Sequence, residues 1–444
     1  MKKSSKKPKI VPQSKNRTKG QNDLATVISQ PYDRVRHGLQ DKYYALNDYN
    51  ITRIIKGKEF EDDHVGENVY TRAQAFLSKW LAEGVLRYEE KPALYVYHQE
   101  FTLNGKTVTR KAVIGALELA RFDEGIVLPH ERTHDGPKMD RLNLTRATEA
   151  YFGNIFILYP DAENKIDALL DAAIQRDPDV DVRELFEKDV RQKLWVVTDE
   201  NVLAAVQAEM APKRGLIIAD GHHRYETALA YRDEQRAKYP DAPANAAFNY
   251  LMVALVSMSN PGLTILPTHR LIFDYDTLSA DDVLAKAAEY FDVEEVADRA
   301  ALEEKMDAAI GQTGSFGLVT HGAYHFLTLK SVAVMDSLAP DRAQAWRELD
   351  ASILHKLLLE KIMGSPAAQI DAKEGIEYLR EPDLGYERVA NEETAFLFIL
   401  NATRMEQITA CTSVGEKMPQ KSTDFYPKIV TGLAILDVNP QEKL

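Results

Sequence analysis

The chain has 444 residues, of which 45% are hydrophobic and 28% are charged. This composition is ordinary for a soluble globular protein, and the length exceeds what one hydrophobic core usually serves, so we expect two closely packed domains. The formal net charge is −13, and residues 1–20 hold seven lysines, one arginine and no acid, which leaves −21 on the rest of the chain. A body this acidic repels phosphate backbones, so we expect no nucleic-acid partner and interpret residues 1–20 as a basic disordered tail.

The sequence also indicates a compartment. It has no apolar run long enough to cross a bilayer, and its first residues lack the apolar segment of a secretory signal. The single cysteine, Cys411, cannot form an internal disulfide and has no activating neighbour, so we interpret it as a packing residue. We therefore expect a cytoplasmic protein without a membrane partner.

The first part of the chain predicts an extended segment, a helix and a β-hairpin. The residue before Pro31 is pushed out of the helical region, so Pro31–Asp33 is expected to be extended and then to turn. Apolar residues recur with helical spacing over residues 69–80. The alternating runs 94–103 and 107–119 are joined by Asn104-Gly105, which is a strong hairpin signal.

Strands and helices alternate over the following hundred residues. An apolar run ends at Pro129 and is followed directly by His130 and Glu131. The other predicted segments here are helices over residues 138–148, 166–174 and 201–210 and strands over residues 154–159 and 194–198.

The middle of the chain, Gly215–Tyr231, predicts a strand, a sharp loop and a helix. The loop Asp220–Arg224 has the sequence DGHHR and opens the helix, where the unpaired N–H groups and the positive dipole end favour an anion. Gly221 lets the backbone turn, and the two imidazoles and the guanidinium donate hydrogen bonds to phosphate or carboxylate oxygens. The alternative is that Asp220 is only an N-cap and the histidines solvate the first turn.

Beyond this loop, residues 250–258 and 263–273 are apolar runs separated by the turn Asn260-Pro261-Gly262. They predict adjacent antiparallel strands, with a sheet edge or bulge at Pro267. From about residue 276 the pattern changes to helix, hairpin, helix. The predicted segments are helices over residues 280–291 and 349–363, a hairpin over residues 316–329, and strands over residues 395–400 and 428–438.

Several segments carry a resemblance that covers nearly the whole chain. They are Pro31–Asp33, Leu128–Thr133, Lys138 with Asp140 and Arg141, Ile218–Leu229, Leu266–Arg270 and Met418–Lys428. In these segments the chain resembles the domain of unknown function 1015 family, often labelled SerC-like. The DGHHR loop and the His130-Glu131 pair also resemble elements of free serine kinases built on the ParB/sulfiredoxin fold. The chain departs from the family pattern at Arg34–His37, where a hydrophobic pair is usual.

The resemblance implies a mixed α/β (α+β) fold. A ParB/sulfiredoxin-like nucleotide-binding core would occupy residues 21–275, and an α+β domain in residues 276–444 would return Met418–Thr423 to the site. The implied activity is phosphate transfer between a nucleotide and a small hydroxy amino acid, serine or phosphoserine, with ATP or ADP and Mg²⁺ as cofactors.

The resemblance also implies roles for individual residues. Glu131 would be the catalytic base beside His130, and Asp220 would act in catalysis by holding Mg²⁺. The residues expected to bind phosphate or substrate are Gly221, His222, His223, Arg224, Lys138, Arg141, His269, Arg270, Lys421, Ser422 and Thr423.

Two alternatives concern Glu131 and the class of activity. Glu131 could instead pair with Arg132 or Arg141 in a structural network. The protein could also be a nucleotide-dependent regulatory switch that performs no chemistry on a metabolite.

A further alternative is a metal-dependent hydrolase. His222 and Glu226 are four residues apart on one predicted helix, and His130 or His269 could complete the metal's ligands. Adjacent histidines diverge on a helix, however, and Arg224 would lie close to the cation, so both features favour an anion.

Overall fold

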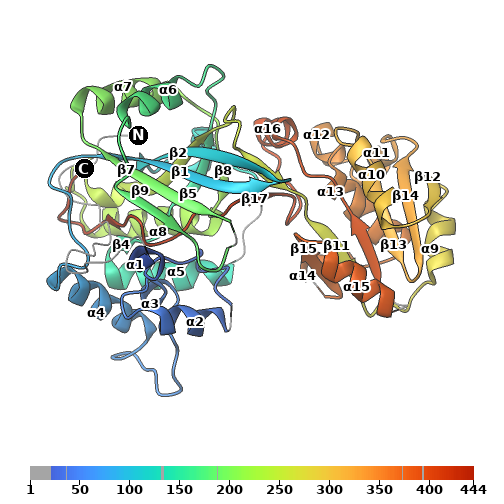
Figure 1. Cartoon of the computed structure of the whole chain (residues 1–444), viewed down its shortest axis with the longest axis horizontal. Helices are drawn as coiled ribbons and strands as arrows, with labels where there is room; N and C mark the ends of the chain where they lie inside the picture. Colours follow the sequence, from blue (N-terminus) through green and yellow to red (C-terminus); the bar gives the residue numbers. More distant parts are fainter. Residues whose placement is uncertain (1–21, 37, 132–134, 188, 373, 393–394) are drawn as a thin grey trace. The chain divides into compact units, whose positions relative to one another are not determined.

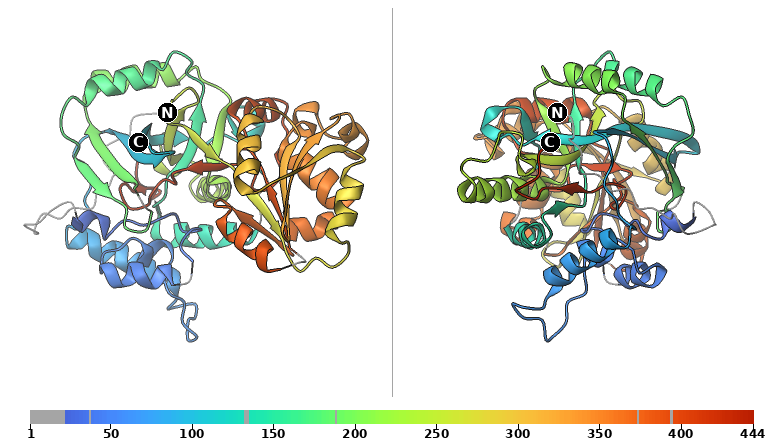
Figure 2. Two further views of the ribbon diagram at one scale, coloured as in Figure 1. Left: turned by 45° about the vertical axis from the view of Figure 1, so that its right-hand side comes forward. Right: turned by 90° about the vertical axis from the view of Figure 1, so that its left-hand side faces the viewer.

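The computed structural model describes residues 22–444 apart from 37, 132–134, 188, 373 and 393–394, so the predicted basic tail lies outside the described residues. The architecture is mixed α/β, as predicted, in two compact units (Figure 1; Figure 2). Unit 1 holds the described parts of Met1–Leu128, Thr133–Leu263 and Pro427–Leu444, and unit 2 holds those of Pro129–Arg132 and Thr264–Tyr426. The chain thus leaves unit 1 after Leu263 and returns to it at Pro427, whereas the sequence places one boundary near residue 275.

An eight-stranded sheet forms the centre of unit 1. Its strands are β1 (Leu94–Leu103), β2 (Lys106–Glu118), β3 (Val127–Pro129), β5 (Ile155–Tyr159), β6 (Val180–Arg183), β7 (Arg191–Val197), β8 (Leu216–Asp220) and β9 (Tyr250–Ser257). They lie in the order β3-β8-β5-β9-β2-β1-β7-β6. The central strands β5 and β9 are parallel and buried throughout, which explains their continuous apolar sequences. The predicted hairpin is confirmed: Asn104 and Gly105, at φ 49° and 73°, join β1 to β2.

Helices cover this sheet. They are α1 (Asn22–Ala25), α2 (Leu39–Leu46), α3 (Thr52–Ile55), α4 (Val69–Ala82), α5 (Asp135–Thr148), α6 (Lys165–Ala173), α7 (Glu200–Met210) and α8 (His222–Lys238). Helix α5 packs on α8, α4 packs on α5, and α6 packs on α7. Figure 1 shows α6 and α7 at one end of the unit and α4 and α5 at the other. The apolar face predicted for α4 is confirmed, because Ala73, Leu77 and Trp80 are buried.

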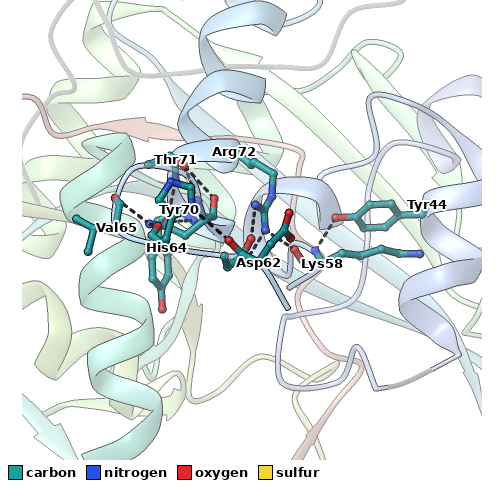
Figure 3. A network of polar contacts seen from close by, with 10 residues as sticks. Tyr44, Lys58, Asp62, His64, Val65, Tyr70, Thr71 and Arg72 are labelled. Carbon is teal, nitrogen blue, oxygen red and sulfur yellow. Dashed lines mark hydrogen bonds and ion pairs between the residues drawn. The ribbon is translucent and has the colours of Figure 1, made fainter. Parts of the chain in front are cut away.

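The start of α4 is fixed by polar contacts (Figure 3). Arg72 Nη1 and Nη2 donate to the two carboxylate oxygens of Asp63 at 2.6 and 2.8 Å. The Asn68 side chain accepts hydrogen bonds from the second and third N–H groups of the helix, which would otherwise lack partners. Since α4 packs against α5, these contacts support the helix that carries Lys138 and Arg141.

Unit 2 contains a second sheet. Its strands are β11 (His269–Ile272), β12 (Phe291–Val296), β13 (Ser315–Thr320), β14 (Ala323–Leu329), β15 (Ile376–Leu379) and β16 (Phe396–Ile399), in the order β12-β14-β13-β16-β11-β15. Each neighbouring pair is antiparallel. A separate antiparallel pair joins β10 (Thr264–Leu266) to β17 (Asp424–Tyr426).

Short helices complete unit 2. They are α9 (Ala280–Ala287), α10 (Arg299–Ala308), α11 (Val334–Leu338), α12 (Gln344–Arg347), α13 (Asp350–Ile353), the π-helix η3 (Leu354–Ile362), α14 (Ala367–Ala372), α15 (Asp383–Asn391) and α16 (Met405–Ser413). In neither unit does a described helix combine the length and the hydropathy needed to span a membrane.

Two strand predictions are wrong. Residues 263–273 do not form one strand beside β9, because Pro267 lacks the N–H that a ladder needs and the run divides into β10 and β11. Residues 428–438 contain only the short strand β18 (Leu436–Asp437), which pairs with β4 (Ala150–Tyr151). The apolar residues before β18 are buried in the core of unit 1. Their backbone is irregular and does not join the ladder of the sheet.

A chain of hydrogen-bonded polar side chains links Tyr97 on β1 and Gln192 on β7 to the half-buried Glu184. The Glu184 carboxyl group accepts hydrogen bonds from the amides of Gln30 and Gln192, and Tyr97 donates to Gln192 Oε1 at 2.5 Å. Burial, with help from the nearby charge of Glu187, raises the pKa of Glu184 from 4.5 to about 8. The folded protein therefore holds a proton on Glu184 at neutral pH.

This raised pKa predicts the direction of a pH dependence. Because the folded pKa lies above the unfolded one, the contribution of Glu184 to stability is complete below pH 4.5 and is lost as the pH rises through about 8. We expect the melting temperature of the native protein to fall over that range relative to Glu184→Gln, which carries no titrating group there. Thermal melts of both proteins from pH 5 to pH 9 measure this, and parallel curves would contradict it.

Candidate anion-binding site

The loop between β8 and α8 has the predicted strand, turn and helix form. β8 ends at Asp220, Gly221 adopts a left-handed conformation at φ 95°, and α8 begins at His222. Gly221 rather than Asp220 is the N-cap residue, so the N-cap alternative for Asp220 is wrong. His222 is buried and His223 is half-buried in the first turn. The N-cap of this 17-residue helix is thus a glycine, which has no side chain of its own at the positive end of the helix.

Arg224 is held in a slot between two glycines. Its Nη2 donates to Asp220 Oδ2 at 2.8 Å, and its Nη1 donates to the Asn154 carbonyl at 2.9 Å. A Cβ on Gly153 would lie 2.8 Å from Nη1, and a Cβ on Gly221 would lie 2.9 Å from Nη2. Only residues without a Cβ at both positions leave room for the guanidinium in this place.

The Asp220 carboxylate meets a second cation from the end of the chain. Lys428 Nζ lies 3.5 Å from Asp220 Oδ1, and the lysine side chain is only 11% exposed. We call Pro427–Thr431 the crossing segment, because it runs from Asp220 to Ser29, where Ser29 and Thr431 exchange backbone hydrogen bonds of 2.8 and 3.0 Å.

The crossing segment is also tied to the sheet by a buried arginine. Arg110 on β2 donates to the carbonyl of Pro427 and to the Gln99 side chain, and its guanidinium lies 4.6 Å from the ring of Phe156. Gln99 in turn donates to the Lys428 carbonyl at 2.9 Å. Burial lowers the pKa of Arg110 to about 10, so it still carries a charge at neutral pH. Arg110 was not among the residues predicted from the sequence, although a charged residue within an alternating strand is a signal of a buried polar contact.

Two predicted cations on α5 have acidic partners in unit 1. Lys138 Nζ lies 2.5 Å from Glu226 Oε2. Arg141 donates through Nη2 to Asp140 at 2.6 Å and through Nη1 to the Ile55 carbonyl at 2.7 Å. The described contacts thus pair Arg141 with Asp140 rather than with Glu131. Glu226, which the metal alternative requires as a ligand, is an ion-pair partner of Lys138.

His130 and Glu131 belong to unit 2, where they sit beside the residues around Thr423. The backbone of Glu131 forms a bridge with Met418, whose N–H donates to the His130 carbonyl at 2.8 Å. The His130 ring is fully buried, and its Nε2 lies 2.8 Å from Thr423 Oγ1 and 3.8 Å from Glu131 Oε1. That carboxylate oxygen is buried and has no hydrogen-bond partner among the described residues. A buried acceptor without a partner is poised to accept a proton or a donor.

His269 and Arg270 on β11 are buried in unit 2. Arg270 donates to the Lys421 carbonyl at 3.1 Å, and burial lowers its pKa to about 10. His269 Nδ1 accepts from the Leu400 N–H at 3.2 Å, and burial lowers its pKa to about 4, so it is neutral at pH 7. Arg270 therefore fixes the backbone at Lys421, the first residue of the turn Lys421–Thr423, and His269 fixes the backbone at Leu400.

That turn places one predicted residue in solvent and one in the interior. Lys421 is exposed and has a left-handed backbone at φ 57°. Ser422 is buried, and its hydroxyl donates to the Pro419 carbonyl at 2.7 Å. Lys421 is thus the more accessible of the two for a ligand.

The predicted residues divide into two sets, one in each unit. Unit 1 holds Lys138, Arg141, Asp220, Gly221, His222, His223 and Arg224. Unit 2 holds His130, Glu131, His269, Arg270, Lys421, Ser422 and Thr423. Arg132 and Thr133 lie outside the described residues.

The chain matches one known protein family over most of its length. The profile described as protein of unknown function (DUF1015) matches residues 10–352. The chain belongs to this family. A search of curated proteins gave no match.

The DUF1015 chain also shows distant likeness to solved structures. A free serine kinase in complex with ADP is 12% identical, with 74% of this chain and 94% of that chain covered and a TM-score of 0.36. A conserved hypothetical protein from Pyrococcus furiosus is 14% identical, with coverage of 74% and 97% and a TM-score of 0.34. A C-terminally truncated SbnI from Staphylococcus aureus is 10% identical, with coverage of 73% and 87% and a TM-score of 0.34.

The residues around Asp220 do not fit a metal ion held by the protein alone. The Asp220 carboxylate already faces Arg224 and Lys428, and a metal cation there would compete with both. Across the described part of this DUF1015 chain, no three His, Cys, Asp or Glu side chains gather closely enough to bind a metal.

The glycine slot predicts that the position of Arg224 can be changed without loss of the fold. In Gly153→Ala the new methyl group would displace the end of a flexible side chain rather than backbone, so we expect the variant to fold. Its melting temperature should lie a few degrees below the native value, because the part-buried pair with Asp220 is broken. Crystal structures of the variant and the native protein should show Arg224 withdrawn from Asp220 and Asn154. An unmoved guanidinium would contradict the slot.

Proposed function

We propose that this chain binds the phosphates of a nucleotide at the Gly221–Arg224 loop and transfers a phosphoryl group between that nucleotide and a small hydroxy amino acid. The observation that supports the proposal is the left-handed Gly221 joint, which presents the start of α8 beside the fixed guanidinium of Arg224. Helix N–H groups and a guanidinium together suit the oxygens of a phosphate better than any other common ligand. ATP or ADP is the nucleotide that the sequence resemblance favours, and serine or phosphoserine is the amino acid.

In the proposed reaction Glu131 is the base. The substrate hydroxyl would give its proton to the carboxylate as its oxygen bonds to the terminal phosphorus, and the bond from that phosphorus to the rest of the nucleotide breaks. The buried Glu131 Oε1 without a described partner supports this role, and the contact between His130 and Thr423 supports a fixed position for the neighbouring backbone. Phosphoryl transfer depends mainly on placement and charge neutralisation, so the base contributes only part of the rate.

The remaining predicted residues would place the substrate and neutralise its charge. We assign this role to His222, His223, Lys138, Arg141, His269, Arg270, Lys421, Ser422 and Thr423. These residues would contribute in two ways. Lys421 is exposed and could contact the substrate directly, whereas Arg270 and His269 would hold the backbone at Lys421 and Leu400 in position.

Mg²⁺ enters this proposal with the nucleotide. The ion usually keeps several waters and binds phosphates with one or two carboxylates, and Asp220 is the candidate carboxylate in the loop. Since Arg224 and Lys428 occupy both oxygens of Asp220, the protein residues would bind phosphate first and the ion would be held chiefly by the nucleotide.

Nucleotide binding tests the first half of the proposal. Isothermal titration with ATP, ADP and CTP, each with Mg²⁺, should show binding to the native protein and an affinity at least tenfold weaker in Gly153→Ala, because the variant displaces one charge-assisted donor. Arg146→Gln is the matched control, since Arg146 on the exposed side of α5 pairs with Glu234 and should leave the affinity unchanged. If none of the three nucleotides binds, the proposal is wrong.

Replacement of the base tests the second half. Glu131→Gln keeps the size of the side chain and removes the proton acceptor, so we expect phosphoserine formation to fall by about 10²–10⁴-fold with nucleotide affinity unchanged. The assay measures phosphoserine and the released nucleotide together. A regulatory switch that only binds nucleotide would form no phosphoserine in the native protein, and native turnover that persists in the variant would remove Glu131 from the mechanism.

A further inference from the structure

A small, partly open cavity lies in unit 1, where α5 and α8 pack over the sheet. Its volume is about 50 Å³. Its polar lining residues include Tyr32, Arg141, Thr145, Arg224, Thr227 and Thr431. Its apolar wall includes Ile55, Leu144, Phe152, Ile155 and Leu251. Two guanidinium groups in the lining of one small cavity are unusual, because buried cations need partners.

The two arginines are held firmly and are largely withdrawn from solvent. The Arg141 and Arg224 side chains are 11% and 15% exposed. The Arg141 guanidinium stacks on Tyr32, with 4.2 Å between its carbon and the ring centroid. Burial raises the pKa of the Tyr32 hydroxyl, while the charges of Arg224 and Arg141 act to lower it, so that hydroxyl lies within the field of both cations.

Both guanidinium groups keep donors in reserve. Each has five N–H bonds, and Arg141 uses three of them on Asp140 and the Ile55 carbonyl. Arg224 uses two, on Asp220 and the Asn154 carbonyl. The described contacts thus leave two N–H donors on Arg141 and three on Arg224, and Tyr32 and Thr431 also line the cavity.

The size of the cavity limits what can enter. A volume of about 50 Å³ is far below the roughly 300–1,000 Å³ of pockets that hold drug-sized ligands, so a nucleoside does not fit. It exceeds the roughly 10–15 Å³ that one water requires, so a group of a few heavy atoms does fit.

We infer that this cavity is a subsite for a small oxyanion, a phosphate or a carboxylate, bound between Arg141 and Arg224 and separate from the nucleotide phosphates. The inference deepens the proposed function and rests on it in one respect: the bound group would be the anionic group of the amino acid substrate. Arg224 then contacts both ligands, since it belongs to the loop and to the cavity wall. The apolar wall lowers the local dielectric constant and so strengthens the ion contacts.

Titration with inorganic phosphate and, in a second arm, with acetate tests the subsite at constant ionic strength in a buffer without other oxyanions. We expect one of the two to bind the native protein, and Arg141→Gln to weaken that binding at least tenfold, because the variant removes a charge-assisted donor. Arg146→Gln on the same helix keeps the net charge equal to that of Arg141→Gln and should bind like the native protein.

A second variant tests the cavity independently, in case Arg141→Gln does not fold. Leu144→Phe adds volume from the apolar wall and leaves every charge in place, so it should abolish oxyanion binding while ADP affinity stays within threefold of the native value. Thermal melts of each variant show that it is folded.

The outcomes separate the subsite from the proposed function. Oxyanion binding that persists in saturating ADP supports a separate subsite, and displacement of the oxyanion by ADP overturns it. Failure of both phosphate and acetate to bind also overturns it, whatever the nucleotides do. If phosphate binds and no nucleotide does, the subsite stands and the proposed function fails.

Discussion

The carboxylate of Asp220 is the contact on which the rest of the candidate site depends. It holds Arg224 at 2.8 Å and faces Lys428 at 3.5 Å, so it joins the end of β8, the first turn of α8 and the crossing segment. These side chains are 11% to 23% exposed, which places them between surface pairs and fully buried ones. A pair of unit charges about 4 Å apart gains roughly 4 kcal/mol at an effective dielectric constant near 20, before the cost of desolvation. Without the carboxylate, Arg224 and Lys428 would each lose an ion-pair partner, and removing one member of such a pair usually costs more than the pair itself contributes.

This arrangement explains why the loop can be cationic and still fold. Asp220 balances part of the positive charge that Arg224 and Lys428 bring to the start of α8. Gly153 and Gly221 add the steric condition, because they leave room for the guanidinium of Arg224 where it reaches both Asp220 and the Asn154 carbonyl. The loop therefore offers its N–H groups and the guanidinium to a ligand with little further rearrangement, which lowers the entropic cost of binding.

The sequence predicts this loop because every signal in it is local. A β-branched run, a glycine and a helical repeat within Gly215–Tyr231 are enough to give β8, the turn and α8. The alternative that Asp220 is the N-cap was wrong because the chain turns at Gly221. Asp220 pairs with Arg224, four residues on, and with Lys428, which is more than two hundred residues away. The same limit applies to Arg110, whose partner Pro427 is 317 residues away.

The strand errors have a related cause. Residues 263–273 and 428–438 are apolar because they are buried, and burial alone does not distinguish a ladder strand from a crossing segment. In the first run Pro267 decides the outcome, since it ends β10 and lets β11 enter the second sheet. At the start of the second run the backbone is held by Gln99 and Ser29, and Arg110 holds the preceding Pro427; these are side-chain and single-bridge contacts that no local pattern reports. These same contacts bring Thr431 to the wall of the cavity beside Arg224.

The overall charge adds the last constraint. The chain carries a formal net charge of −13, so its electrostatic field repels an approaching anionic ligand. How strongly it does so depends on the range of that field. At physiological ionic strength screening reduces the interaction of exposed charges beyond about 8 Å, whereas part-buried groups are screened much less. The acidic surface therefore slows the approach of anions only weakly, while the charges of the part-buried Arg141 and Arg224 are screened much less. An acidic protein can in this way bind a small oxyanion, because the surface repulsion is screened at a distance and the attraction of two part-buried guanidinium groups acts at short range.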